Sequence, residues 1–165
     1  LQKKLGDKYE VKNFGVSART MMNKGDLPYM NELAWRDAQA FNPDIVIVKL
    51  GTNDSKTHNW AHGVDEYRQS MQAMIDTLKA LPSKPKIYLC SPIPAFKDSW
   101  TISDSIIVNG EMPIIKKLAK KNKCQFIDLH TSYTYGDLML KDGIHPNAKG
   151  AEKMANIIFE AIEKK

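Results

Sequence analysis

Residues 45–55 read IVIVKLGTNDS. Residues 45–50 form a mostly apolar run, and a glycine and polar side chains follow it. A nearly continuous run of β-branched residues is typical of a parallel strand that is buried on both faces of a sheet. In open sheets of this kind, ligands bind outside the carboxyl ends of the strands. We therefore expect a functional site at residues 51–55 and at the ends of neighbouring strands.

Short apolar runs bounded by turn residues predict three further strands, at Tyr9–Phe14, Ile87–Cys90 and Phe126–Leu129. Apolar residues at helical spacing predict the helices Met30–Phe41, Val64–Leu81, Ile106–Lys121 (with a true start near Met112) and Ala148–Ile162. Strands that alternate with helices indicate a three-layer α/β domain with a parallel sheet.

The composition is that of one globular domain. The chain has 165 residues, of which 42% are hydrophobic and 26% charged, and its formal net charge is +5. No apolar run approaches the roughly 18–20 residues that cross a bilayer, so we expect no membrane span. Only Arg19, Arg36 and Arg68 are arginines among the 24 basic residues. Since arginine dominates phosphate and base recognition, we expect no nucleic-acid partner.

Three polar motifs stand out: NFGVSART at residues 13–20, GTNDS at 51–55 and DGIHP at 142–146. Gly15 permits close approach of the backbone and can present its N–H to a ligand. Asn53 can offer a side-chain amide donor. Asp142 precedes His145 closely enough for a tight turn to direct its carboxylate at the imidazole Nδ1–H. That contact fixes the tautomer of the ring and leaves Nε2 as a base.

Each motif also has a purely structural explanation. A glycine after a strand is often a turn, Asp54 or Ser55 can cap a helix, and Asp-Gly is a common turn pair. We interpret the three motifs as functional because they occur together, in order, at the expected strand ends. A metal site is not expected, since the four histidines and two cysteines fall in no metal-ligand spacing.

Together, the motifs resemble the second, third and fifth sequence blocks of the SGNH, or GDSL-like, serine hydrolases, over nearly the whole chain. The resemblance implies a flavodoxin-like fold, no cofactor, and hydrolysis of an ester through an acyl-enzyme. By position, it makes Gly15 a backbone oxyanion donor and Asn53 a side-chain one. It makes His145 the general base and then the acid, and Asp142 the residue that orients it.

The longer stretches around the first two motifs further resemble carbohydrate O-acetylesterases of the sialate type. This implies a small-molecule or glycan ester as substrate, and the family leans towards secreted or periplasmic enzymes. Arg19, His58 and Trp60 follow the motifs and are candidate substrate-binding residues. Equally, Arg19 can pair with a surface acid and Trp60 can pack under a loop. A lipid or thioester hydrolase, or a non-catalytic carbohydrate-binding or scaffold protein, remain as alternatives.

The nucleophile of that family is the serine of a Gly-Asp-Ser motif, which this sequence lacks. In the family pattern this motif precedes the block at Gly15, so we expect it upstream of Leu1. Residues 1–165 would then form a single, N-terminally incomplete SGNH-like domain, inactive alone. Its sheet would lack the first, central strand, between those starting near Tyr9 and Ile45. Ser17, Ser55 and Ser91 are weaker nucleophile candidates, since turn, capping or loop roles are open to them.

Overall fold

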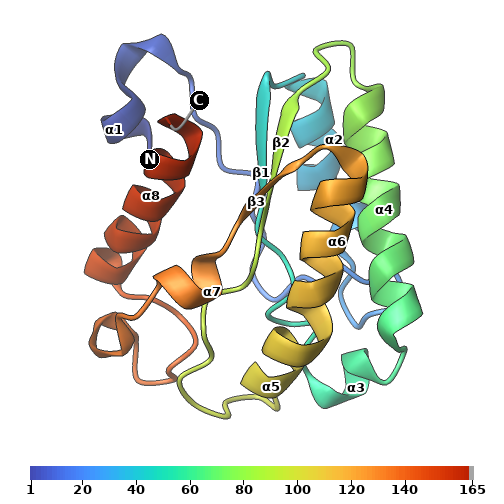
Figure 1. Cartoon of the computed structure of the whole chain (residues 1–165), viewed down its shortest axis with the longest axis vertical. Coiled ribbons are helices and arrows are strands. Elements are labelled where there is room, and N and C mark those ends of the chain that lie inside the picture. The colour runs from blue at the N-terminus through green and yellow to red at the C-terminus, as the bar shows by residue number, and fades with distance from the viewer. Residues whose placement is uncertain (164–165) are drawn as a thin grey trace.

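The computed structural model describes residues 1–163 and has the three-layer α/β architecture that the sequence predicts (Figure 1). Its sheet consists of β1 (Ile45–Val48), β2 (Lys86–Cys90) and β3 (Gln125–Ile127), in the order β1-β2-β3. Both pairs are parallel, with Val46 opposite Ile87 and Leu89 opposite Phe126. The predicted strands at 45–50, 87–90 and 126–129 are therefore confirmed, with shifts at their ends.

Helices cover both faces of the sheet. They are α1 (Gln2–Leu5), η1 (Gly6–Lys8), η2 (Tyr29–Asn31), α2 (Leu33–Ala40), α3 (Thr57–Trp60), α4 (Val64–Ala80), α5 (Asp104–Ile106), η3 (Ile107–Glu111), α6 (Met112–Asn122), α7 (Leu129–Ser132), η4 (Gly136–Leu138) and α8 (Ala148–Glu163). In Figure 1, α4 and α6 lie on one side of the sheet and α8 on the other, while α3, α5 and α7 gather at its lower end. None of the helices within residues 1–163 is long and apolar enough to cross a membrane.

Two apolar cores hold the layers together. Between the sheet and α4 and α6, the cluster includes Tyr67, Ile75 and Ile115, none of which is exposed. On the α8 face, Ile127 and Ile158 belong to a second, smaller cluster. Burying each such side chain stabilises the fold by about 1.5–3 kcal/mol, so the cores fix the strand ends in place.

One helical column runs without a break from Asp104 to Asn122, although its middle changes pitch. Residues Ile107–Glu111 form a π-helix, and Pro113 occupies the first turn of α6. Proline has no N–H to donate to the preceding turn, and it stands here where the helix changes from π to α pitch. The start near Met112 is confirmed for α6, and Glu111, the last residue of the π-helix, is fully buried.

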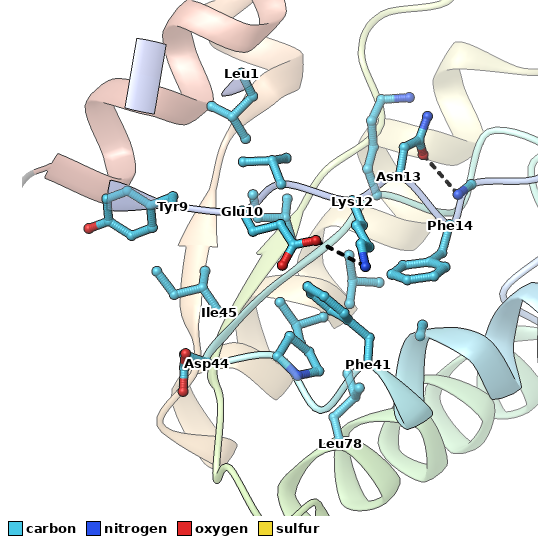
Figure 2. Close-up of a pocket in the computed structure, with 18 of the residues that line it drawn as sticks. Leu1, Tyr9, Glu10, Lys12, Asn13, Phe14, Phe41, Asp44, Ile45 and Leu78 are labelled. Carbon is cyan, nitrogen blue, oxygen red and sulfur yellow. Dashed lines mark hydrogen bonds and ion pairs between the residues drawn. The ribbon is translucent and has the colours of Figure 1, made fainter. Parts of the chain in front are cut away.

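The predicted strand at Tyr9–Phe14 is wrong: the segment contains no β-strand. A groove of about 780 Å³ lies beside β1 and is lined both by this segment and by residues 45–50. In Figure 2, Tyr9 and Phe14 lie on one side of it, and Ile45 and Leu78 on the other. Within residues 1–163, no strand pairs with this segment. Among the described residues β1 pairs with β2 alone, so the groove-facing edge of β1 is unpaired there.

Candidate active site

The first two motifs are joined by a buried carboxylate. Asp54 Oδ2 accepts a hydrogen bond from the Met21 N–H at 2.9 Å, and Oδ1 accepts one from the Met22 N–H at 2.7 Å. Asn53, its neighbour, donates from Nδ2 to the Arg19 carbonyl at 3.2 Å. The Asp54 side chain is fully buried, and burial raises its pKa to about 7 in spite of the two N–H donors. These contacts place Asn53 against the segment that follows the first motif.

The loop of residues 92–103 connects the second motif to the third. At one end, the Ser103 N–H donates to Ser55 Oγ at 3.2 Å. Near its middle, Ser99 Oγ donates to the Asp142 carbonyl at 2.7 Å. All three motifs therefore belong to one connected region beyond the carboxyl ends of the strands, as expected for a parallel sheet.

The third motif contains an Asp–His pair. Asp142 Oδ2 lies 3.2 Å from His145 Nδ1, while Oδ1 accepts the N–H groups of Ile144 and His145 at 2.7 and 2.8 Å. These backbone donors, with the imidazole, lower the pKa of Asp142, so the carboxylate stays ionised. Gly143 at φ 70° allows the tight turn. The His145 side chain is 59% exposed.

The sequence predicts Gly15 as a backbone oxyanion donor, and the structure offers Ala18 as a second candidate. The Gly15 N–H donates to Asn13 Oδ1 at 2.9 Å, so it is already occupied. Ala18 has a left-handed φ of 65° and directly precedes Arg19, whose carbonyl contacts Asn53. Within residues 1–163, the Ala18 N–H makes no hydrogen bond. Ala18 could not be predicted as a candidate from the sequence, because nothing about an alanine indicates that it adopts a left-handed conformation.

Two of the expected substrate-binding residues have other partners. Arg19 Nε lies 2.6 Å from Glu32 Oε1, and its Nη1 donates to the Ser17 carbonyl. His58 Nε2 lies 3.1 Å from Asp26 Oδ2. The contacts of Arg19 lie within residues 17–32, and the His58–Asp26 contact joins this region to α3.

The Trp60 ring packs against neighbouring residues of the chain. Its ring lies 5.7 Å from that of Tyr67 and fills the space in which a side chain at Gly110 would stand. This is the structural alternative that the sequence left open for Trp60.

With this geometry, the sequence matches the profile of the GDSL-like Lipase/Acylhydrolase family over residues 1–153. The chain belongs to this family. It is 54% identical over 181 residues to an acetylxylan esterase from Xylanibacter ruminicola, covering 99% of this chain and 38% of that protein. The chain thus spans less than half the length of this relative.

Solved structures agree on the fold. The acetyl xylan esterase AlAXEase has a TM-score of 0.64 at 26% identity, covering 81% of this chain and 74% of that one. The native aryl esterase of M. smegmatis has a TM-score of 0.78 at 21% identity, covering 98% and 81%. The second likeness concerns the fold alone.

Of the three serines near the motifs of this GDSL-like chain, two are buried. Ser55 is fully buried and donates to the Thr52 carbonyl at 2.8 Å. Ser91 is also fully buried, and its Oγ accepts the His130 N–H. Ser17 alone of the three is exposed. Within residues 1–163, no group of three His, Cys, Asp or Glu side chains could hold a metal ion.

A second buried carboxyl lies beneath the GTNDS turn. Glu111 is fully buried, and neither of its oxygens has a hydrogen-bond partner within the described chain. A side chain at Gly51 would collide with Glu111 Oε2, and the Tyr67 hydroxyl lies 3.0 Å from the same point. Burial, reinforced by the nearby Asp54 carboxyl, raises the pKa of Glu111 well above its ordinary value. A buried carboxyl group with a raised pKa therefore lies beneath the GTNDS turn.

Glu111→Gln should change how stability depends on pH. Above its ordinary pKa of 4.5 the unfolded chain releases the Glu111 proton, whereas the folded chain retains it. The wild-type free energy of unfolding should therefore fall, relative to the variant, by up to about 1.4 kcal/mol per pH unit between that value and the raised pKa of the folded chain. Urea denaturation at pH 5, 6, 7 and 8 measures the difference. Glu152→Gln on the exposed side of α8 is the control, and parallel wild-type and Glu111→Gln curves would contradict the prediction.

Proposed function

We propose that this chain forms most of the active site of an O-acetylesterase that acts on a carbohydrate. The observation that carries the proposal is the Asp142–His145 pair at 3.2 Å, with the second imidazole nitrogen exposed, in the region that also contains Asn53. A binding or scaffold protein has no evident use for a base oriented in this way. Similarity to an acetylxylan esterase over 99% of the chain supports the same reaction.

The reaction would proceed through an acyl-enzyme. A serine Oγ attacks the acetyl carbonyl carbon as His145 Nε2 takes its proton, and Asp142 holds Nδ1–H in place. The carbonyl oxygen becomes an oxyanion, which Asn53 Nδ2–H and a backbone N–H stabilise. Asn53 has two amide protons, so the bond to Arg19 leaves one available.

When the tetrahedral intermediate collapses, the ester C–O bond breaks and His145 returns the proton to the sugar oxygen. The acetyl group is now an ester of the serine. Water then attacks this ester while His145 takes a proton from it. Acetate leaves as the proton passes back to the serine Oγ, which restores the site.

The serine itself, we propose, follows a strand outside residues 1–165 that occupies the groove beside β1. The β1 run Ile45–Val48 is apolar throughout, as in strands buried on both faces, yet only Val48 is buried here. Its open edge leaves N–H and C=O groups for a further parallel strand. That strand would end at the same edge of the sheet as Asn53, which suits a nucleophile directly after it.

A neutral, xylan-type glycan fits the site better than sialate. Sialate binding would call on the guanidinium of Arg19 to pair with the sugar carboxylate. That guanidinium is already held by Glu32 and by the Ser17 carbonyl. The similarity at 54% identity is likewise to a protein described as an acetylxylan esterase.

Acetate release tests the proposed function. The full-length protein should release acetate from acetylated xylo-oligosaccharides and should hydrolyse octanoyl esters far more slowly. Preference for the octanoyl ester would instead support a lipid or thioester hydrolase of the same family. Glycan binding without acetate release would support a carbohydrate-binding or scaffold protein.

A further inference from the structure

Trp100 is an exposed aromatic side chain beside the general base. Its indole ring lies 5.7 Å from the imidazole of His145, at 71° to it, in an edge-to-face arrangement. The residue is 58% exposed, whereas Trp35 is 8% exposed and part of the core. Single exposed apolar side chains are common on protein surfaces, so it is the place of this ring beside His145, and not its exposure alone, that points to a binding role.

The backbone fixes this ring in position. Trp100 and the β-branched Thr101 both have left-handed φ values, of 53° and 60°, which side chains of their kind rarely adopt. On one side, Ser99 is bonded to the Asp142 carbonyl. On the other, Ile102 is buried and Ser103 is bonded to Ser55. The strained turn therefore has anchors before and after it, and it turns the indole outward.

We propose that Trp100 is a sugar-binding platform, on which a pyranose ring of the acetylated glycan stacks next to His145. The proposal rests on the esterase function argued above and adds the subsite that holds the glycan. An equatorially substituted pyranose, such as xylose, presents axial C–H groups on both faces. These groups pack against the face of an indole, whose π-system carries partial negative charge.

Stacking at this point would also determine which ester is cleaved. The exposed His145 must reach the proton of a nucleophile that attacks the acetyl carbonyl. A ring held on Trp100 places its own acetyl group, or that of the adjoining sugar, within the region between Asn53 and His145. Positioning of this kind raises turnover because the reacting groups are already aligned. Trp60, packed against Tyr67, does not offer such a surface.

The test compares two acetyl esters in the full-length protein, an acetylated xylo-oligosaccharide and ethyl acetate, which has no ring to stack. In Trp100→Ala, the ratio of kcat/KM for the glycan to that for ethyl acetate should fall by about 10-fold or more. Trp100→Phe should recover part of this ratio. Phe96→Ala removes a ring from the same loop that lies against Gly136, and it should leave the ratio within about twofold.

An unchanged ratio in Trp100→Ala would overturn the proposal, because a platform must act on the glycan selectively. Equal losses on both esters would overturn it too, since they would show that Trp100 only supports His145. Wild-type protein that hydrolyses neither ester would refute the esterase function instead. In that event, the binding of unacetylated xylohexaose, measured by tryptophan fluorescence, tests the platform separately. Binding that is about 10-fold weaker in Trp100→Ala than in the wild type would support the platform. Equal binding by the two proteins would refute it.

Discussion

Replacement of His145 by alanine should lower kcat for acetate release by a factor on the order of 10⁴ to 10⁶. The imidazole is the only side chain in the region of the three motifs that is paired through Nδ1 with a carboxylate and exposed at Nε2, within residues 1–163. Without it, nothing takes the proton from the nucleophile or returns it to the leaving sugar. Single removal of a general base of this kind costs about this much in other serine hydrolases.

The fold should survive that replacement. His145 is exposed, and the Asp142 carboxylate keeps the Ile144 N–H as a partner. The urea midpoint of His145→Ala should therefore match that of the wild type. His62→Ala, an exposed histidine between α3 and α4, is the matched control and should retain full turnover. A loss of less than about 10-fold in His145→Ala would contradict the role of His145 as general base.

The second large effect concerns the groove beside β1. Residues 1–165 alone should show no measurable turnover, because loss of the nucleophile costs on the order of 10⁶-fold in rate. The full-length protein should be active. In hydrogen exchange, the β1 amides that do not bond to β2 should exchange about 100-fold more slowly in the full-length protein, because a parallel strand would cover them.

Two results would count against the proposed strand. Turnover by residues 1–165 at the full-length rate would mean that the nucleophile lies within them. Equal exchange of the β1 amides in both proteins would mean that nothing pairs in the groove. Amides of β2, which is paired on both sides, provide the internal reference for exchange.

Features that depend on neighbours in sequence could be predicted. The run IVIVKL predicted β1, and α4 follows the spacing of its apolar residues from Val64 to Ala80. The contact between Asp142 and His145 was also predictable, because the two residues are three positions apart and one tight turn brings them together. In each case the physical cause lies within a short segment.

Features that depend on distant segments could not be predicted. Tyr9–Phe14 has a strand-like sequence, but a strand requires a partner, and residues 1–163 provide none for it. The sequence around Trp60 is compatible both with a sugar-binding ring and with a packed ring. The ring is packed because Tyr67, which lies on α4, is in contact with it. The outward turn at Trp100 is set by bonds to Asp142 and Ser55, more than 40 residues away in either direction.

Covalent labelling tests the central claim most directly: that this chain supplies the base and oxyanion donors for a serine carried on a strand outside it. The full-length protein would be treated with a fluorophosphonate, and the labelled residue found by mass spectrometry. We expect one labelled serine, outside residues 1–165, directly after an apolar run, and no labelling in His145→Ala. Label on Ser17, or on any other serine of residues 1–165, would contradict the claim.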